Sequence, residues 1–586
     1  MTRLAQTIFA LLVCATFGAF FVTQRLKRAP LVVRQLTVSD QFSPLHRKAT
    51  IRFQLKRSDD ATVAVIDRNG GAVRFLARDR RLPGGHPLQF YWNGRTAGGG
   101  LAPDGKYRVR IGLRQAGRSV TLRRVIALDT KPPKPVVTIT SPKGTGPAIL
   151  PAAGGRGLTF RFTEPPLNPR ISVYNSDGHR LRLVTSFPGV QGSSTGSWNG
   201  TVNGRPVPPG TYFVAVSVVD RVGNRGSSPP LGRRVRGAGA GRPGVTVRYL
   251  ALQAPLEPAP PGQPVQLYVD ARGARYTWEL LRLGSPKPVA RGTSAGTTLR
   301  VPVPASPAGV ALLRVTSGAH RASVPFPVAA PTVSRPVLVV LPALSWQGRN
   351  PVDDEGDGLP NTLDRGGPVT LSRPFAGAGM PSGFTTSEQP LLAFLDRAGL
   401  RYDITTDLAL ARGGGPLQDH RGVVLAGNPR WVTGDLLSRL RRYVTGGGHV
   451  LTLGTDSLRR TVGLAGDELI DPSGPLADDA LGARLDPIAS RRVDLLAFRG
   501  DSLGLFTGTD GLFGGFDRFE PAASLGRGTR LLAGAGEEEG RPVIAAYQLG
   551  KGLVIRTGLP QWSERLSAGD PNVVAVTRRA WTLLSR

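Results

Sequence analysis

An internal repeat restricts the fold of this chain more than any other feature of its sequence. Trp92 and Trp198 lie 106 positions apart, and Tyr107 and Tyr212 lie 105 positions apart. In both copies, valine and isoleucine alternate with polar residues before the tryptophan and again around the tyrosine. Alternation with a period of two is typical of half-buried β-strands. The sequence therefore predicts two copies of one β module.

Short turns separate the predicted strands of both copies. An Asn-Gly pair at 69–70 and an Asp-Gly pair at 177–178 are typical of hairpins, and a Pro-x-Gly turn precedes each tyrosine. Trp-Asn-Gly followed by a glycine turn and Pro-x-Gly-x-Tyr resembles the Ig-like module of flagellar hook-capping proteins. That family has aspartate where this chain has Asn93 and Asn199. The resemblance implies structural or adhesive β-sandwiches, commonly found outside the membrane, with the tryptophan and tyrosine in the core.

The length of 586 residues exceeds what one hydrophobic core normally supports. Short apolar strands between Pro/Gly turns predict a third β-sandwich that lacks the Trp–Tyr motif. A basic stretch rich in glycine and proline predicts a flexible linker. The predicted order is an N-terminal anchor (1–30), Ig-like modules (31–132 and 133–224), the linker (225–244), a third Ig-like sandwich (245–330) and an α/β domain (335–586).

The N-terminal segment is apolar. Between Arg3 and Arg25 lie 21 uncharged residues, with the most apolar part at 8–22. As a helix, this segment reaches roughly 30 Å, the thickness of a bilayer core. Phenylalanines at the cleavage positions argue against a cleaved signal peptide, and Cys14 fits an apolar membrane residue. We therefore expect a transmembrane helix that contacts the membrane through residues 4–24.

The orientation of that helix is predicted differently by two features. The positive charges that follow it favour a body inside the cell. The Ig-like modules favour a body outside the cell. We give the modules more weight, so the sequence predicts a single-pass cell-membrane protein with an extracytoplasmic body.

The positive charge is confined to one part of the chain. The net charge is +34, from 75 Lys+Arg against 41 Asp+Glu. Residues 1–334 hold 47 basic and 13 acidic residues, whereas residues 335–586 hold 28 of each. An arginine-rich proteome would explain this excess, and so would contact with an anionic envelope polymer or lipid headgroups. Nucleic acid is not predicted as a partner, because the chain has neither a reader motif nor aromatics interleaved with the cations.

From residue 335 onward, continuous apolar runs alternate with amphipathic stretches. The run VLVVLP at 337–342 is typical of a parallel strand buried on both faces. Ser387 is expected to cap the first of the helices. This alternation predicts a doubly wound α/β sheet of the flavodoxin or amidotransferase kind. Further strands are expected at 402–405, 422–426 and 449–454, a hairpin within 542–562, and helices at 387–400, 433–448 and 571–584.

The order of these motifs, from VLVVLPALSWQ to GKGLVIRTGLPQW, resembles the C-terminal domain of the large subunit of dimethylformamidase. That domain is itself similar to the class I glutamine amidotransferase fold. In amidotransferases the turn after a central strand carries a nucleophilic cysteine, and in dimethylformamidases it carries acidic and tyrosine residues that can bind iron. Here the turn reads GNPRW at 427–431, and the only cysteine is Cys14. The resemblance therefore implies the fold, and the departures imply that both chemistries are lost.

A serine nucleophile is not predicted either. GDSLG at 500–504 fits the G-x-S-x-G string, but a glycine-rich run follows where the nucleophile elbow needs a helix. The histidine partner should follow the serine, whereas the last histidine, His449, precedes it. We therefore expect Ser502 to lie in a loop.

One stretch has the pattern of a metal site. DDEGDGLPNTLD at 353–364 places oxygen ligands at the spacing of a twelve-residue calcium loop, with glycine at its sixth position. It also resembles the DxDGDGxPD calcium repeats of extracellular proteins. Glutamate at the third position and aspartate at the twelfth depart from the loop pattern, and a solvated acidic loop is the alternative. The candidate calcium ligands are Asp353, Glu355, Asp357, Asn361 and Asp364.

Together these patterns predict a membrane-anchored envelope protein. Its Ig-like stalk carries a catalytically degenerate amidotransferase-like domain that acts in binding or scaffolding. Apart from calcium, no cofactor and no catalytic residue is predicted. The alternative is a metal-dependent amide hydrolase related to dimethylformamidase, with the metal held by Asp353, Asp357, Asp407 and Asp456.

Overall fold

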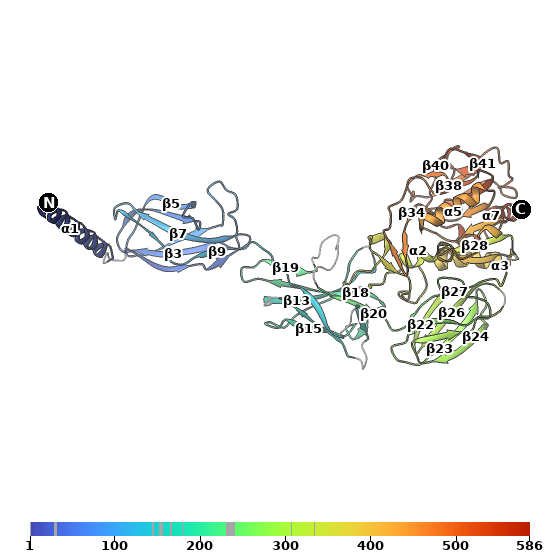
Figure 1. The fold of residues 1–586 in the computed structure, drawn as a ribbon, viewed down its shortest axis with the longest axis horizontal. Helices are drawn as coiled ribbons and strands as arrows, with labels where there is room; N and C mark the ends of the chain where they lie inside the picture. The colour runs from blue at the N-terminus through green and yellow to red at the C-terminus, as the bar shows by residue number, and fades with distance from the viewer. Residues whose placement is uncertain are drawn as a thin grey trace.

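The computed structural model describes the chain except for residues 1, 28–31, 143–145, 152–155, 164–166, 179, 230–240, 306–307, 333–334 and 416. Figure 1 shows a row of β-rich units that begins with one N-terminal helix and ends in a larger α/β unit. Strands account for 43% of the chain and helices for 14%. The chain as a whole is thus mostly β. The sequence predicted a transmembrane helix, then β modules, then a doubly wound α/β domain. This predicted fold class is therefore wrong.

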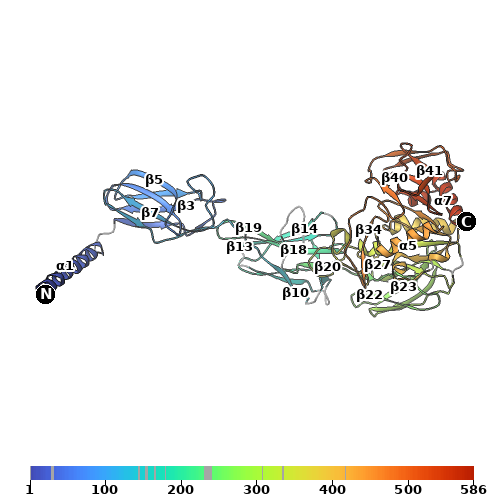
Figure 2. The ribbon, with the colours of Figure 1, turned by 45° about the horizontal axis from the view of Figure 1, so that its top comes forward.

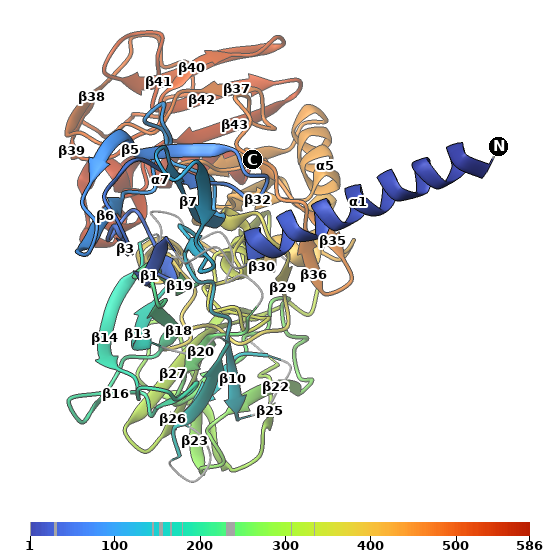
Figure 3. The ribbon, with the colours of Figure 1, turned by 90° about the vertical axis from the view of Figure 1, so that its left-hand side faces the viewer.

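The N-terminal helix α1 (Thr2–Lys27) projects away from the other elements (Figure 3). Its described apolar side chains are exposed, Phe9 by 70% and Phe17 by 71%. Within the described residues, no helix is long and apolar enough to cross a membrane. The strongly apolar stretch covers only residues 8–22, whereas a crossing needs about 20 apolar residues. The predicted anchor through residues 4–24, and with it the single-pass cell-membrane location, are therefore wrong.

The first β module has two sheets around one buried cluster. Its strands are β1 (Val33–Val38), β2 (Gln41–Phe42), β3 (Ala49–Leu55), β4 (Asp59–Ile66), β5 (Ala72–Leu82), β6 (Pro87–Trp92), β7 (Gly105–Leu113), β8 (Arg118–Thr121) and β9 (Ile126–Leu128). One sheet has the order β1-β3-β6, and the other has the order β2-β9-β7-β4-β5 with β8 beside β7.

The second β module repeats this arrangement. Its strands are β10 (Val137–Ser141), β11 (Ala148–Leu150), β12 (Leu158–Phe162), β13 (Leu167–Asn175), β14 (Arg182–Pro188), β15 (Thr195–Trp198), β16 (Thr201–Val202), β17 (Arg205–Pro206), β18 (Gly210–Val219), β19 (Arg225–Ser228) and β20 (Gly244–Val247). The sheets have the orders β10-β12-β15 and β11-β20-β18-β13-β14, with β19 beside β18. Because β20 pairs with β11 and β18, this sheet includes residues beyond 224. Most of the predicted linker, residues 230–240, lies outside the described residues.

The repeated Trp–Tyr motif forms the same contacts in both modules. The ring centroids of Trp92 and Tyr107 lie 4.8 Å apart, and those of Trp198 and Tyr212 lie 5.8 Å apart. Each tyrosine hydroxyl donates to the carbonyl of the first proline of its own turn, at 2.5 Å in the first module and 2.7 Å in the second. The motif therefore fixes the turn to the core, as expected of core residues.

The third sandwich comprises β21 (Ala251–Leu252), β22 (Val265–Asp270), β23 (Tyr276–Arg282), β24 (Pro288–Ser294), β25 (Thr298–Val301), β26 (Gly309–Ser317) and β27 (His320–Val328). Its sheets have the orders β21-β22-β25 and β24-β23-β26-β27. Figure 2 shows these strands beside the α/β unit. One buried cluster runs from Leu250 to Leu584 through both units, so they share a single core.

A nine-stranded sheet forms the centre of the C-terminal unit. In order across the sheet, its strands are β30 (Asp403–Thr406), β28 (Val337–Leu341), β31 (Gly422–Leu425), β33 (His449–Thr452), β43 (Gly552–Thr557), β42 (Ile544–Leu549), β41 (Thr529–Gly536), β38 (Val493–Ala497) and β39 (Leu512–Phe516). The first five are parallel, and the remaining pairs are antiparallel. Strand–helix alternation is thus restricted to one half of the sheet. Smaller strands are β29 (Val369–Thr370), β32 (Trp431–Val432), β34 (Arg460–Thr461), β35 (Gly463–Ala465), β36 (Glu468–Ile470), β37 (Ala483–Leu485) and β40 (Ala522–Leu525).

Helices cover both faces of the parallel half. They are α2 (Ala343–Gly348), α3 (Gln389–Arg397), α4 (Asp407–Ala411), α5 (Gly434–Thr445), α6 (Trp562–Ala568) and α7 (Pro571–Leu584). In β28, Val337 and Val339 belong to the cluster that includes α3 and α7, whereas Leu338 and Val340 belong to the cluster that includes α5. The expected cap at Ser387 is not formed, because that residue lies in a π-helical turn (Phe384–Glu388) directly before α3.

Candidate functional site

A polar cleft lies at the edge of the sheet where the parallel strands end. It is lined by residues that follow β28, β31, β33 and β43, together with the π-helical turn and the start of α6. Its volume is about 540 Å³. In open α/β sheets, ligands bind in the crevice outside the carboxyl ends of the strands. This cleft is therefore the candidate functional site.

Glu388 is the buried acid of the cleft. Glu388 is only 2% exposed. The indole N–H of Trp346 donates to Oε1 at 3.4 Å, whereas Oε2 has no hydrogen-bond partner among the described residues. Burial raises the pKa of Glu388 to about 7, although the nearby Arg349 acts in the opposite direction. The carboxyl group can therefore gain or lose a proton near neutral pH.

Gly427 begins the turn after β31, where the fold would place a nucleophile. Its φ is +66°, a left-handed conformation that glycine adopts without strain. A Cβ atom at this position would collide with Oε1 of Glu388. A side chain at Gly427 would therefore have to displace the Glu388 carboxyl group, and the chain's only cysteine, Cys14, lies in α1.

Ion pairs connect the next part of the cleft wall. Nε of Arg430 lies 2.8 Å from Oδ2 of Asp456, and Nη2 lies 3.1 Å from Oδ1 of Asp364. Arg460 also pairs with Asp456, at 3.1 Å. Asp456 has a φ of +54°, and such strain in a residue other than glycine is common at functional sites. The wall is therefore held in one conformation by guanidinium–carboxylate contacts.

Arg349 differs from Arg430 in having no partner of its own. It lies just after α2 and lines the cleft. Its charge acts on the pKa of both Glu388 and Arg430, so the three groups lie near one another. Its guanidinium makes no hydrogen bond or ion pair with any residue that the structure describes. Arg349 is therefore available to a ligand.

A second arginine–carboxylate network lies beside this wall. Glu520 is fully buried and pairs with Arg556 and, at 2.9 Å, with Arg459. It also accepts the backbone N–H of Asp456 at 3.0 Å. Its carboxylate oxygens are thus bound by guanidinium groups and a backbone N–H group.

The residues around the cleft do not fit an iron ion or another metal. The turn 427–431 has neither an acidic residue nor a tyrosine. In the described part of the chain, no three His, Cys, Asp or Glu side chains are placed to hold a metal ion. The four aspartates of the alternative hypothesis are not brought together. Asp407 is buried between β30 and α2, Asp456 pairs with arginines, and Asp353 and Asp357 lie in the acidic loop.

The acidic loop 353–364 folds back on Asp353. This residue is 1% exposed, and its carboxylate accepts the N–H groups of Gly356 at 2.7 Å and Gly358 at 2.8 Å. Burial raises the pKa of Asp353 to about 7. The first predicted calcium ligand is therefore buried and already engaged with the loop backbone.

The other predicted ligands make separate contacts. Asp357 and Asn361 each accept a backbone N–H of the loop at 2.7 Å. Asp364 pairs with Arg430, and Glu355 is exposed. No three acidic groups of the loop are arranged as metal ligands in the described structure. Calcium binding by this loop stays a prediction.

The outer side of the acidic loop binds the second β module. Arg242 donates to the carbonyl of Glu355 through Nε at 3.1 Å and Nη2 at 2.7 Å. The hydroxyl of Ser176 donates to the carbonyl of Gly358 at 2.6 Å, and Leu359 belongs to a small buried cluster with side chains of β18. The loop is therefore a contact between two units that are far apart in the sequence.

The remaining motifs lie away from the cleft. Ser502 lies in a series of turns, as expected, and its hydroxyl donates to the carbonyl of Leu532 at 3.2 Å. His449 accepts the N–H of Leu553 at 3.2 Å through Nδ1. Both residues therefore have local structural roles.

The sequence interpretation missed Glu388 and Arg349. Glu388 was included in a predicted amphipathic helix, where an exposed acid in the first turn is common. Arg349 carries no motif. The one signal available was that Arg349 follows a buried strand by a few residues, which places it at the edge of the sheet where ligands bind.

Comparisons with known proteins identify part of the C-terminal region. Residues 292–472 match the family described as N,N-dimethylformamidase beta subunit-like, C-terminal. The predicted resemblance of the C-terminal domain is therefore confirmed, and the match begins within β24 of the third sandwich. The resemblance of the N-terminal modules to hook-capping proteins is not confirmed. No curated protein matches the chain.

Solved structures share only weak similarity with the chain. A β-galactosidase from Bacillus circulans sp. alkalophilus is 16% identical, with 32% of this chain and 26% of that chain covered and a TM-score of 0.23. The exo-β-1,4-mannosidase Op5Man5 from Opitutaceae bacterium strain TAV5 is 14% identical, with 44% and 37% covered and a TM-score of 0.25. The FN1–FN3 domains of chicken CNTN1 are 9% identical, with 50% and 98% covered and a TM-score of 0.18. The chain spans 26% and 37% of the two glycosidases, and these scores carry no argument about its function.

Proposed function

From the match of residues 292–472 to the dimethylformamidase C-terminal family, we propose that this protein is a dimethylformamidase-related binding protein. Its cleft takes a small polar molecule that carries an anionic group and, close to it, a hydrogen-bond donor. The ligand is held without a covalent bond to the protein, because the turn after β31 has glycine at 427 and so carries no nucleophilic side chain there.

The observation that carries this proposal is the pair of unsatisfied groups in the cleft. Arg349 has no partner among the described residues, and neither does Oε2 of Glu388. The two groups are near each other but form no hydrogen bond. A buried polar atom without a partner costs free energy, so a ligand that satisfies both groups is favoured. A carboxylate would bind the guanidinium, and an adjacent hydroxyl or N–H would donate to Glu388.

The rest of the lining supports a polar ligand. Asn428, Thr455 and Gln561 face the cleft with Arg349 and Glu388. Pockets for small molecules normally orient the ligand through a few such polar groups. Asn428 and Gln561 already accept hydrogen bonds from Ser457 and from the backbone N–H of Asp517. An uncharged apolar molecule would leave Arg349 and Oε2 of Glu388 without partners.

The test is a binding screen with the full chain. The panel contains small carboxylates that carry a hydroxyl, amino or amide group, each matched with its uncharged carboxamide, and binding is measured by calorimetry. We expect carboxylates to bind more tightly than their carboxamides. Arg349→Gln should weaken binding about 10- to 100-fold, as expected for loss of a charge-assisted hydrogen bond.

A matched control is Arg397→Gln, which removes an exposed arginine of α3 that does not line the cleft. This variant should bind like the original protein. Equal affinity for carboxylates and carboxamides, or an unchanged affinity in Arg349→Gln, would rule out the proposed mode of binding.

A second candidate function is amide hydrolysis, which is favoured by the pKa of Glu388 near 7. Its carboxylate would take a proton from water while the water oxygen attacks the amide carbon. The same proton would pass to the amide nitrogen as the carbon–nitrogen bond breaks. Release of amine from small amides would support this candidate if its rate changes with pH at an apparent pKa near 7 and if Glu388→Gln abolishes this pH dependence. If the protein binds its ligand but hydrolyses no amide, hydrolysis is excluded and binding remains the function of the cleft.

A further inference from the structure

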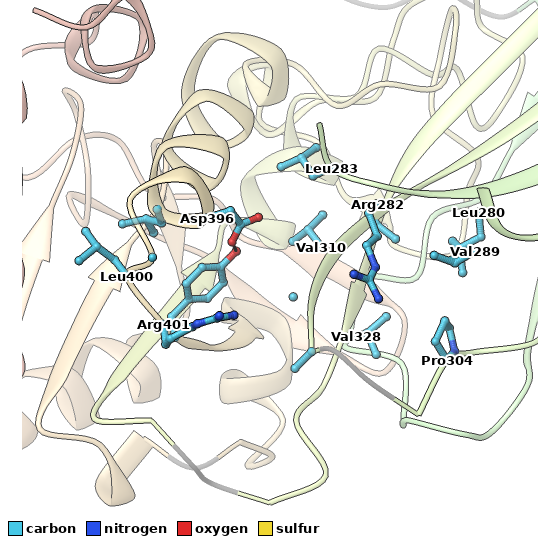
Figure 4. A pocket seen from close by; sticks show the side chains of 16 residues that line it. Leu280, Arg282, Leu283, Val289, Pro304, Val310, Val328, Asp396, Leu400 and Arg401 are labelled. Carbon is cyan, nitrogen blue, oxygen red and sulfur yellow. Dashed lines mark hydrogen bonds between the residues drawn. The ribbon is translucent and has the colours of Figure 1, made fainter. Parts of the chain in front are cut away.

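A separate cavity lies between the third sandwich and α3. Its volume is about 280 Å³, and none of its lining residues lines the cleft. Figure 4 shows it from close by, with side chains of the sandwich on one side and those of residues 396–402 on the other. Ligand sites are common at such junctions between units. The two units share one core, which supports the buried part of the cavity walls.

The walls of this cavity combine apolar and polar surface in about equal parts. Leu280, Val310 and Val328 contribute from the sandwich, and Leu395 contributes from α3. All four are buried, with exposures between 0% and 9%. Apolar walls that are held in place by a core favour the burial of a hydrocarbon group.

Two guanidinium groups stand on opposite sides of this cavity. Arg282 comes from the end of β23, and Arg401 comes from the segment before β30 (Figure 4). Neither guanidinium makes a hydrogen bond or ion pair with a residue that the structure describes. The acid of the cavity, Asp396, accepts the hydroxyl of Tyr402 at 3.1 Å. The charge of Arg401 also acts on Asp396, so these two groups lie near each other. The cavity thus combines apolar surface with two cations and only one acid.

We propose that this cavity binds a small amphipathic anion, with a carboxylate between Arg282 and Arg401 and a hydrocarbon body against the apolar walls. The proposal is independent of the ligand of the cleft. A cavity of about 150 Å³ is known to take up benzene, so the present one has room for a body of about eight to ten carbon atoms. A cation would meet two arginines against one acid, and a neutral chain would gain no ion pair with either arginine.

The test compares three probes of equal length against the full chain. Octanoate, octanol and octylamine are titrated separately, and heat of binding is recorded. We expect octanoate to bind, octanol to bind at least about 10-fold more weakly, and octylamine to show no binding, because only the first pairs with guanidinium groups. Equal binding of octanoate and octanol, or no binding of octanoate, would overturn the proposal.

Variants locate the site. Arg282→Gln and Arg401→Gln are expected to weaken octanoate binding about 3- to 10-fold each, since both side chains are partly in solvent. Val310→Phe should abolish binding by filling the cavity. Arg291→Gln on β24 and Arg349→Gln in the cleft are matched controls that should bind octanoate normally.

If Val310→Phe does not fold, the double variant Arg282→Gln/Arg401→Gln replaces it in the test. Substitution of surface arginines rarely prevents folding. Octanoate affinity that is unchanged in this double variant would contradict the proposed carboxylate position. An affinity that falls only in the cleft variant Arg349→Gln would place the octanoate in the cleft instead, and would equally overturn the proposal.

Discussion

Substitution of Asp353 by asparagine is expected to change stability in a pH-dependent way. Asp353 is buried, and burial raises its pKa from 3.8 in a model peptide to about 7 in the folded chain. Between these two values the folded protein binds more protons than the unfolded chain. Stability therefore falls as pH rises through this window, and the fall ends above the folded-state pKa.

The size of the effect follows from the two pKa values. One pKa unit corresponds to about 1.4 kcal/mol. From pH 5 to pH 8, Asp353 should therefore reduce the free energy of unfolding by about 3 kcal/mol. Asparagine does not titrate. The stability of Asp353→Asn relative to the original protein should thus rise by about 3 kcal/mol over the same range.

The measurement is urea unfolding of both proteins at pH 5, 6, 7 and 8, followed by tryptophan fluorescence. Only the difference between the two proteins is used, so the other buried acids cancel. Glu538→Gln is the matched control, because that acid is exposed and is not among the charges that act on Asp353; its effect should be equal at all four pH values. A difference for Asp353→Asn that is constant with pH would refute the reasoning and show that the two glycine N–H groups keep Asp353 ionised.

Three further predictions concern the turn after β31, the acidic loop and the basic N-terminal part. Gly427→Ala should lower the free energy of unfolding by about 2 kcal/mol in urea titrations, because of its positive φ and the collision with Glu388; an unchanged midpoint would contradict this. If loop 353–364 binds calcium, millimolar calcium should raise the melting temperature saturably, although Asp353, Asp357 and Asp364 would have to exchange their present partners for the ion; an unchanged melting temperature would reject the site. Polyphosphate should bind the full chain with an affinity that falls steeply with salt, and Arg108→Gln/Arg110→Gln on β7 should reduce that slope; salt-independent binding would exclude an electrostatic contact.

The sequence patterns predicted the local elements of the fold well. The strand at 337–342 and the helices at 433–448 and 571–584 are found as β28, α5 and α7 with small differences at their ends. Apolar periodicity reports which side of a segment is buried, and it needs no knowledge of the neighbours. Thr433 accepts the N–H of Leu436 at 3.3 Å, as a helix cap should.

Features that depend on distant parts of the chain were not predicted. The antiparallel half of the large sheet, and the pairing of β20 with the second module, are set by contacts between segments far apart in sequence. The anchor was wrong for a different reason. The stretch 8–22 is apolar, but the flanking polar residues shorten it below the length of a membrane crossing.

The cleft could be located from the sequence but its chemistry could not. The edge of the parallel strands follows from strand order alone. The importance of Glu388 depends on complete burial and on an oxygen without a partner, which no sequence pattern reveals. The acidic loop had the composition of an exposed cation site, yet packing against the second module buried its first aspartate.

The contact between the acidic loop and the second β module has a consequence for synthesis. Ser176 and Gly358 are 182 positions apart, and the last strand of the module, β20, ends at Val247. At roughly 5–20 residues per second, a ribosome completes that strand about 6 to 20 s before it reaches Gly358. The module can therefore fold on the nascent chain before the loop exists. The loop then meets a finished surface, which can select its conformation while the parallel strands are still being made.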